Sequence, residues 1–380
     1  TKNKMIEIRR IEGRKAWSKF VRFAIELYSG NPYYVPPIIS MEVDTFDPAK
    51  NPAFQFCESA YFMAYRDGRA VGRIAGFVNR RANQKFATRV CRFCWADFID
   101  DEEVSRALLD AVGAWGRGWG MNTIVGPLGP TDIDNEGCLV WGFDQLPTTA
   151  NSYNAPYYRR HFESYGLTAD ATWFEYRMEV PEAVPEKHLR VAQVVQQRYG
   201  LRVFADTDAK HIARVWGHKL FHLMNEAYAQ IYGFTELSEE QIDYYVNLYL
   251  PQVPLRLVRL VADADDNLIA FGISIPSLSR AQQKANGRLF PFGWYHLLSA
   301  MYRRGVSDTV DLLLMAVRPD YQGKGVNALL FTELIPEYIR WGFRYVETNA
   351  ELTTNHAVQN QWTSFNAEHH KTRCTFKGAL

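Results

Sequence analysis

The sequence contains no long apolar run. Residues 312–317 are among its longest purely apolar stretches, whereas a helix needs roughly 20 apolar residues to cross a bilayer. Residues 1–7 include no hydrophobic signal core. Cysteine is also scarce, because the chain has only five, an odd number spread over 380 residues. That usage is typical of reduced thiols and not of a disulfide-linked secreted scaffold. These absences predict a cytoplasmic protein without a membrane span.

An excess of either charge is missing as well. Lys and Arg number 43 against 42 Asp and Glu, and this balance disfavours a dedicated nucleic-acid binder. No short repeat or low-complexity tract is visible, which disfavours solenoids and propellers. What the chain does have is enough length for two domains at roughly 100–200 residues each. It is also 14% aromatic, which predicts large buried faces or a deep aromatic-lined groove.

The two halves of the chain show a similar order of predicted elements. Each contains two alternating strands joined by a polar turn, over residues 61–77 and 255–274, and this pattern is typical of β-hairpins. In both halves a further strand and an amphipathic helix follow, at 92–99 with 100–116 and at 309–317 with 325–341. Strands that alternate with helices predict an α/β fold in each half. We expect domains at 1–180 and 201–380, connected by a polar linker helix at 181–200.

The most informative segment is a glycine-rich turn between the predicted strand and helix of the second half. The strand ends at Val317, and Gly323, Lys324 and Gly325 follow. Such a loop can direct backbone N–H groups and the positive end of a helix at an anion. Lys324, with Arg318 nearby, adds charge for a polyphosphate. The loop alone is equally consistent with an ordinary turn and a solvated lysine, and it is neither a Walker A loop nor a dinucleotide fingerprint.

At this loop the sequence resembles the GNAT superfamily of acyl-CoA N-acyltransferases. The family signature is Val-x-Pro-x-Tyr-Arg/Gln-x-x-Gly-x-Gly/Ala, and its loop cradles the pyrophosphate of coenzyme A. The matching residues are Val317, Pro319, Tyr321, Gln322 and Gly325, whereas Asn327 stands at the final small position. The resemblance implies acyl-CoA as co-substrate, no metal, and a coenzyme site made of Ala316, Val317, Gln322, Gly323, Lys324, Gly325, Val326, Asn327 and Asn355.

Asn355 enters this set through a second family motif, in which an Asn at a helix start lies beside the coenzyme arm. A helical stretch is predicted from Asn355 to about Phe365. In the family a Tyr seven residues after the Asn commonly protonates the departing thiolate. Here that position is Trp362, whose indole is not a useful proton donor to a thiolate. The resemblance therefore leaves the general acid unassigned.

Both halves resemble a group of two-lobed GNAT-like proteins, through segments at 31–37, 71–74, 126–127, 153–158 and 316–355. The implied fold is a tandem GNAT-like α/β (α+β) fold, with a mixed sheet flanked by helices in each lobe. In the first lobe the phosphate loop is replaced by Ile-Asp-Asp-Glu-Glu at 99–103. Four carboxylates there would repel a pyrophosphate. We therefore expect the second lobe alone to bind the coenzyme.

The leading functional hypothesis is direct transfer of an acyl group, expected to be acetyl, from acyl-CoA to an unidentified small-molecule or peptide amine. The enzyme would orient the reactants and offer a backbone N–H near Val317 to the oxyanion. A base must also take the amine proton. The candidates are Asp311, Glu347 and Glu351, on strands that would border the cleft, and all three are equally consistent with plain surface carboxylates.

Two other hypotheses remain open. Trp362 at the acid position and Asn327 in the loop favour a catalytically silent binding protein that keeps the fold. Tandem GNAT-like lobes also occur in aminoacyl-tRNA-dependent transferases, although the neutral charge balance disfavours tRNA as a partner.

Several further patterns have plainer interpretations. Cys91 and Cys94 have metal-type spacing without a second pair, and in a strand their thiols face opposite sides. His218, His222 and Glu226 lie four apart on a predicted helix, but the zincin pattern fails there. Residues 132–137 imitate a calcium loop and are interpreted as a polar turn. Residues 116–120 are interpreted as a helix end, and the tyrosines at 153–158 as a cleft lining or a lobe interface.

Overall fold

The computed structural model describes residues 5–380, which divide into two compact units. Unit 1 contains residues 5–174, Ser279–His296 and His370–Leu380, and unit 2 contains Glu175–Leu278 and Leu297–His369. The chain changes unit inside β7 (Thr168–Glu179), α11 (Gly293–Tyr302) and β14 (Glu368–Ala379). The sequence predicted one boundary, at 181–200. Residues 279–296 and 370–380 lie instead in unit 1, because they bond to it: Ser279 Oγ donates to the carbonyl of Pro147 at 2.6 Å, and β14 pairs with β5.

Unit 1 is built on a mixed sheet. Its strands lie in the order β1-β2-β3-β4-β5-β14, with ranges Glu7–Ile11, Cys57–Arg66, Arg69–Asn79, Val90–Phe98 and Thr123–Gly126 for the first five. Neighbours are antiparallel except β4 and β5, which are parallel. The short strand β6 (Cys138–Trp141) pairs with β14. The helices are α1 (Arg14–Leu27), α2 (Ile39–Thr45), α3 (Arg80–Lys85), α4 (Glu102–Gly118), α5 (Tyr158–Tyr165) and α10 (Ser279–Ala285), with a 3-10 turn at Pro52–Gln55.

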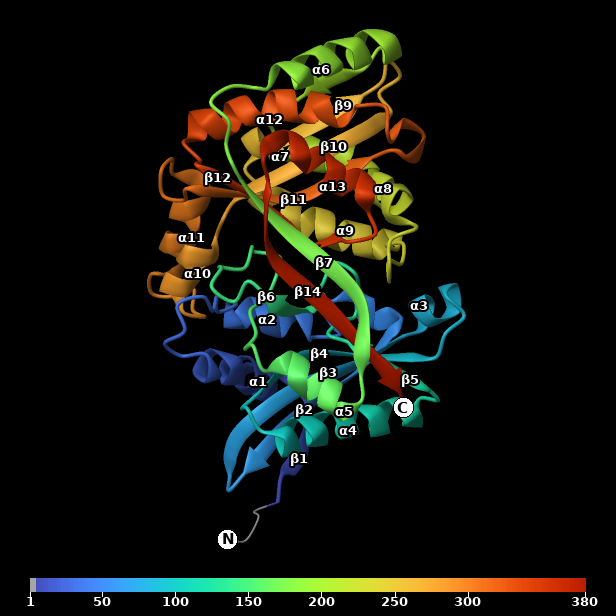
Figure 1. Cartoon of the computed structure of the whole chain (residues 1–380), viewed down its shortest axis with the longest axis vertical. Coiled ribbons are helices and arrows are strands. Elements are labelled where there is room, and N and C mark those ends of the chain that lie inside the picture. Colours follow the sequence, from blue (N-terminus) through green and yellow to red (C-terminus); the bar gives the residue numbers. More distant parts are fainter. Residues whose placement is uncertain (1–4) are drawn as a thin grey trace. The chain divides into compact units, whose positions relative to one another are not determined.

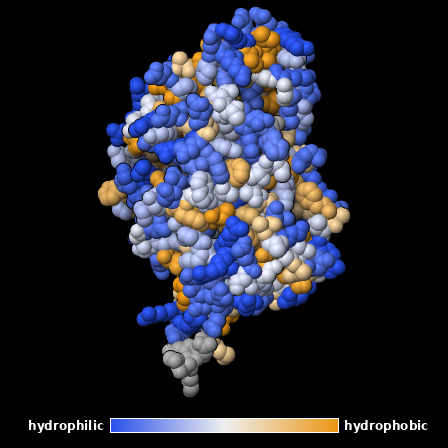
Figure 2. Space-filling view, in the orientation of Figure 1, coloured by the Kyte–Doolittle hydropathy of each residue, from blue (hydrophilic) through white to orange (hydrophobic). Residues whose placement is uncertain are grey.

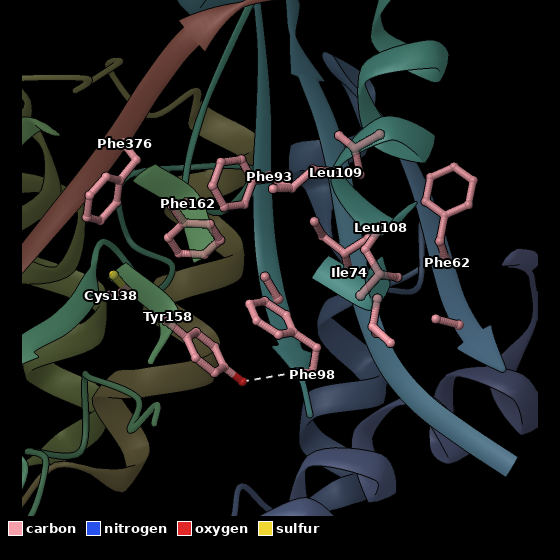
Figure 3. Packing of buried hydrophobic residues seen from close by; sticks show 14 of the residues in the cluster. Phe62, Ile74, Phe93, Phe98, Leu108, Leu109, Cys138, Tyr158, Phe162 and Phe376 are labelled. Atoms are coloured by element: carbon pink, nitrogen blue, oxygen red, sulfur yellow. Dashed lines mark hydrogen bonds between the residues drawn. The ribbon is translucent and has the colours of Figure 1, made fainter. Parts of the chain in front are cut away.

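Strand periodicity gives unit 1 two apolar cores, one on each face of its sheet. Along β2, Phe62 packs with α4 and α5, whereas Tyr61 and Met63 pack with α1 and α2, as the two-residue period of a strand requires. Figure 3 shows the first of these cores, in which Phe98 stacks on Tyr158. The Tyr158 hydroxyl accepts a hydrogen bond from the Phe98 amide at 3.1 Å. The β4–α4 junction is thereby held against α5.

Unit 2 repeats the same plan with different strands. Its order is β7-β12-β11-β10-β9-β8, where β12 to β8 span Tyr345–Thr348, Thr309–Val317, Leu268–Pro276, Val258–Ala262 and Arg202–Phe204. Only β11 and β12 are parallel. The two-residue strand β13 (Glu351–Leu352) pairs with β7. Each unit therefore has one parallel pair, β4 with β5 and β11 with β12, in an otherwise antiparallel sheet.

Helices cover both faces of the unit 2 sheet (Figure 1). On one face α12 (Asn327–Trp341) packs against β9 and β10, and α6 (Glu186–Tyr199) packs against α12. On the other face α8 (Gly217–Tyr228) contacts β10 and β11 and is flanked by α9 (Glu239–Tyr249). The remaining elements are α7 (Ala209–His211), a π-helix (Ile212–Trp216), α13 (His356–Trp362) and 3-10 turns at Leu250–Gln252, Leu255–Leu257, Pro319–Tyr321 and Thr363–Phe365.

The sequence predicted most of these elements. Both hairpins, the strand at 309–317 and the two amphipathic helices are confirmed. The second hairpin begins at Val258 and not at residue 255, because the residues after Pro254 form a 3-10 turn. Helix α4 begins two residues later than predicted, since Asp101 is its N-cap. The predicted linker helix is α6, which belongs to unit 2 and packs on α12. The predicted fold class, a mixed sheet flanked by helices in each lobe, is confirmed.

Candidate functional site

The parallel strands β11 and β12 of unit 2 separate from each other partway along. Their pairing runs from Thr309–Tyr345 to Leu312–Thr348 and then ends, while β11 continues to Val317. At the same level β10 and β11 shift register opposite Ile273 and Ser274, which leaves Leu313 as an extra residue. Such a bulge bends a strand and redirects its side chains. An opening therefore lies between residues 313–317 and the segment that follows β12.

The backbone of β11 directs hydrogen-bonding groups into this opening. The amide of Arg318 donates to the carbonyl of Ile269 at 2.8 Å, so residues 318 and 316 face β10. In an antiparallel ladder the intervening residues then face the other way, which here is the open side. The carbonyls of Met315 and Val317 accept hydrogen bonds there from Tyr228 at 2.7 Å and from Gln322 at 3.0 Å. The amides of Met315 and Val317 therefore face the opening as donors.

The loop after β11 leaves a set of backbone amides without acceptors before and at the start of α12. Gly323 and Gly325 have φ values of +72° and +81°, a region that favours glycine. A Cβ on Gly325 would also lie 2.7 Å from Val191 of α6. Among residues 5–380 we find no acceptor for the amides of Gly323, Gly325, Val326 and Asn327. Unsatisfied amides at a helix start, where the helix dipole is positive, form a site for an anion.

The two basic side chains at this loop differ in how they are used. Arg318 makes a double hydrogen bond to Asp320, at 2.7 and 2.9 Å, so much of its charge is already neutralised. Lys324 is exposed, and its Nζ lies over the rings of Tyr199 and Tyr321 at 5.4 and 5.2 Å from their centres. No ion pair involves Lys324 in the described part of the chain. Lys324 is therefore the cation that an incoming phosphate would meet.

Two asparagines predicted to contact a coenzyme have structural partners. The side chain of Asn327 donates to Gln361 Oε1 of α13 at 2.9 Å, so it ties the start of α12 to α13. Asn355 is the N-cap of α13, and its Oδ1 accepts from the amide of Val358 at 3.4 Å. Capping uses only the oxygen of Asn355, and its amide NH₂ is not consumed by that bond.

The three carboxylates predicted as bases lie at two different levels of the strands. Asp311 is buried on β11, directly opposite Glu347 on β12 in the paired part of the ladder. Glu347 in turn lies opposite Arg177 of β7. Glu351 follows the end of β12 and lies in the segment that borders the opening. The structure thus places Glu351 at the opening, and Asp311 with Glu347 below it.

Glu351 is held by Trp362, which stands seven residues after Asn355. Both of its carboxylate oxygens accept from the indole Nε1 of Trp362, at 2.9 and 2.8 Å. Trp362 itself is buried. Burial raises the pKa of Glu351 to about 8, although the bond from Trp362 acts in the lowering direction. Burial therefore favours the protonated form of Glu351, a carboxylic acid that can donate a proton.

One residue at the opening was missed by the sequence analysis. Tyr228, on α8, donates to the carbonyl of Met315. Burial raises the pKa of Tyr228 to about 12, and the charge of Glu351 acts in the same direction. The same charge contributes to the raised pKa of Tyr176 on β7. Tyr228 precedes β11 by more than 80 residues, and the only available signal was its position on an amphipathic helix.

A small apolar recess of about 20 Å³, roughly the room of one water molecule, lies beside Trp362. Helix α12 supplies three of its walls and β7, β11 and β12 supply others, and the lining residues include Leu312, Phe331, Ile335, Tyr338, Val346 and Phe365. Such a lining suits a hydrocarbon and offers little to a charged group.

The remaining sequence patterns have clear positions. His218 and His222 gather with Glu239 of α9 and not with Glu226, so that ligand atoms of His218, His222 and Glu239 lie within 4.8 Å of one another. Cys91 and Cys94 are buried thiols, as are the other three cysteines. Within 132–137, Asp134 accepts from the amide and hydroxyl of Thr131 and closes a polar turn, as predicted.

The tyrosines at 153–158 were predicted to line a cleft or a lobe interface, and this was wrong for Tyr153 and Tyr158. Both are buried in the core of unit 1. The hydroxyl of Tyr158 lies 2.6 Å from that of Tyr28 and 3.2 Å from Asp97 Oδ1. Residues 116–120 end α4, as predicted.

Sequence comparison finds distant relatives. No protein-family profile matches the chain. "Protein YghO" of Escherichia coli (strain K12) is 26% identical over 93% of this chain and 90% of its own length. A "Bacterial ceramide synthase" of Caulobacter vibrioides (strain NA1000 / CB15N) is 24% identical over 95% of this chain and 94% of its own length.

Comparison with solved structures decides the fold. A tandem GNAT protein from the clavulanic acid biosynthesis pathway, determined without AcCoA, superposes with a TM-score of 0.56 at 13% identity. The match covers 99% of this chain and 98% of that one. The chain has the tandem GNAT fold. The predicted coenzyme residues of the GNAT loop lie at the start of α12 in unit 2, and Asn355 lies at the start of α13.

The residues at this GNAT loop fit a pyrophosphate. The amides without an acceptor and the exposed Lys324 are together what a phosphate group requires. No helix among residues 5–380 combines the length and the apolar character needed to cross a bilayer.

Proposed function

We propose that this protein is an N-acyltransferase that transfers the acyl group of an acyl-CoA to an amine, in unit 2. The observation that carries the proposal is the opening between β11 and β12, with backbone donors at Met315 and Val317, beside the exposed amides at the start of α12. The tandem GNAT fold supports the same assignment. Metal chemistry is not needed for this reaction.

The loop residues would hold the coenzyme. Amides of Gly323, Gly325, Val326 and Asn327 would bind the pyrophosphate, and Lys324 would add its charge. Ala316 and Val317 would lie along the arm that reaches the thioester, with Gln322 fixing the carbonyl of Val317. The NH₂ group of Asn355 is the part of that side chain left to contact the arm.

The chemistry needs no acyl-enzyme. The amine nitrogen attacks the thioester carbon, a C–N bond forms, and the carbonyl oxygen becomes an oxyanion that the amide of Val317 stabilises. The C–S bond then breaks, and protonated Glu351 donates its proton to the departing thiolate. The amine proton passes to a base, for which Asp311 and Glu347 remain the candidates. The products are an amide and free coenzyme A, and the proton taken by the base restores Glu351 through solvent.

A long-chain amine is the acceptor that we propose to test first. The Caulobacter relative is named a ceramide synthase, and a ceramide is the amide of a fatty acid with a long-chain amino alcohol. Short soluble amines and peptides remain the comparison set.

The deciding experiment combines calorimetry with thiol release. Acetyl-CoA and palmitoyl-CoA are titrated into the wild type and into Lys324→Glu, and released coenzyme A is then followed with a panel of amines. We expect binding by the wild type that weakens roughly tenfold or more in Lys324→Glu. Lys85→Glu on α3 of unit 1 serves as the matched control. Absence of binding by the wild type would falsify the proposal.

A second candidate function is ligand binding without turnover. It is favoured by Asn327, whose side chain stands where the GNAT signature has a small residue and bonds to Gln361. This alternative predicts that acyl-CoA binds but that no amine in the panel accelerates release of coenzyme A. Steady release with any amine eliminates it.

A further inference from the structure

An exposed aromatic tip projects from unit 1 between α10 and α11. Phe290 and Phe292 are 75% and 68% exposed, and Trp294 and Tyr295 are exposed as well. Aromatic side chains of this size are normally buried, and a group of them on a surface marks an interaction site. Figure 2 shows hydrophobic atoms protruding at the left edge of the molecule, at the height of α10 and α11 in Figure 1.

The tip is rigidly built and is not a loose loop. Its base is fixed by Gln283, which donates to the carbonyls of Pro32 and Tyr34 at 2.8 and 3.0 Å. The carbonyl of Gly287 accepts from the amide of Ile39 at 2.9 Å. Within the tip, the indole of Trp294 donates to the carbonyl of Pro291 at 2.9 Å. The aromatic rings are thus presented to solvent on a preorganised support.

The charges within the tip segment itself have one sign. The sequence contains no Asp or Glu between Asp266 and Asp308. Within residues 279–296 the charged side chains are Arg280, Lys284 and Arg288, all exposed. None of the three makes an ion pair among the residues that the structure describes. This basic segment stands out in a chain whose formal net charge is only +1.

We propose that the tip and α10 form a docking surface for an anionic lipid bilayer. Aromatic rings flanked by Lys and Arg are the combination that enters the headgroup region of an anionic membrane. A second copy of this chain is a poorer occupant, because it would bring another three positive charges to the same surface. Docking needs no acyl transfer, so the proposal goes beyond the proposed function and can fail independently of it.

The test is co-sedimentation of the full chain with vesicles. One set is phosphatidylcholine alone, and the other contains about one third phosphatidylglycerol, both at about 0.1 M salt. We expect binding to the anionic vesicles only, and its loss at high salt. The variant Phe290→Ser/Phe292→Ser should bind at least about tenfold more weakly. Arg280→Gln/Lys284→Gln/Arg288→Gln should lose roughly a hundredfold, at about fivefold per charge.

The control is Phe86→Ser, which removes an exposed aromatic next to Lys85 elsewhere on unit 1 and should bind like the wild type. Circular dichroism and thiol release with a soluble amine check that each variant is folded. Either of two results overturns the proposal: no wild-type binding to anionic vesicles, or undiminished binding by the tip variant. A change of oligomeric state on light scattering, without vesicle binding, would assign the tip to a second copy instead.

Discussion

The β4–α4 junction of unit 1 and the β11–α12 junction of unit 2 occupy equivalent places in two similar sheets, yet their helix amides are satisfied differently. At α4 the side chain of Asp101 accepts from the amides of Glu103 and Val104 at 2.9 and 3.4 Å. At α12 no side chain caps the helix. The amides of Ala328 and Leu329 donate to the carbonyls of Gly325 and Val326, and the amides of Gly323, Gly325, Val326 and Asn327 have no acceptor among the described residues. One helix start is therefore capped by a carboxylate, and the other leaves amides unsatisfied.

The acidic residues of unit 1 are also paired, so their role there is structural. Asp101 accepts from Arg66 at 2.6 Å, and Asp100 bonds to Arg160 and to His161. The sequence predicted repulsion of a pyrophosphate by four carboxylates. The structure gives a second physical reason why a phosphate is not expected to bind at this junction. The side chain of Asp101 already accepts hydrogen bonds from the helix amides there.

The two openings differ in the same way. After the β4–β5 pairing ends, the chain of unit 1 continues along β4, and the amide of Leu128 donates to the carbonyl of Phe93 at 2.7 Å. In unit 2 the carbonyls of β11 beyond Leu312 are reached by side chains, namely those of Asn349, Tyr228 and Gln322. The free part of β4 therefore bonds to backbone, and the free part of β11 bonds to side chains.

The largest expected effect concerns Glu351 in unit 2. We expect Glu351→Gln to lower kcat by roughly a hundredfold or more, because the proton donor is lost. For a donor with a pKa of about 8, wild-type activity should fall as pH rises through that value. Since the bond from Trp362 lowers this pKa, Trp362→Phe should move the fall to higher pH. A pH–rate profile with no change in either variant removes Glu351 from the mechanism.

The next effect concerns the glycines of the β11–α12 junction, which is called the open junction below. Gly325→Ala must place a Cβ at φ +81° and 2.7 Å from Val191. We expect a loss of about 1–3 kcal/mol in unfolding free energy and roughly tenfold in affinity for acyl-CoA. Gly68→Ala, in the unit 1 turn at φ +76° with nothing within 4 Å, is the matched control. The Gly68→Ala variant has the backbone strain without the clash and should leave the affinity for acyl-CoA unchanged. Calorimetry and urea unfolding of both variants separate the two costs.

These contrasts show how far the sequence could lead. Local patterns predicted both hairpins, the strand at 309–317 and the glycine loop, because periodicity and turn chemistry are short-range properties. The contacts that complete the site are long-range. Nothing near Glu351 in the sequence indicated that Trp362 would hold it, or that Tyr228 would reach the opening from α8. The assignment of residues 279–296 to unit 1 likewise depends on hydrogen bonds to Pro32 and Pro147, far away in the chain.

A smaller effect is expected at the β4–α4 junction of unit 1. Asp101→Ala removes the N-cap of α4 and the partner of Arg66, and should cost about 0.5–2 kcal/mol of stability without changing acyl-CoA affinity. The bond from Arg66 lowers the pKa of Asp101 in the folded protein. Ionised Asp101 therefore stabilises the fold fully above the pKa of an unfolded Asp, about 3.9, and this stabilisation is lost as pH falls through the lower pKa of the folded state. Urea unfolding at neutral and acidic pH should therefore show the wild type and the variant converging in acid. Equal stability at neutral pH would contradict this account of the junction.

The smallest effect concerns Arg318, the second basic side chain of the loop. Because Asp320 already binds its guanidinium at two points, Arg318→Gln should weaken acyl-CoA binding by less than about twofold, far less than Lys324→Glu. Asp320→Asn removes that partner and should strengthen binding by up to about threefold at low salt, with the gain disappearing as salt screens the charge. Calorimetry at two salt concentrations measures both. If Arg318→Gln instead matched Lys324→Glu, the arginine would have to exchange Asp320 for the ligand, and the open junction would owe its anion affinity to two cations and not to one.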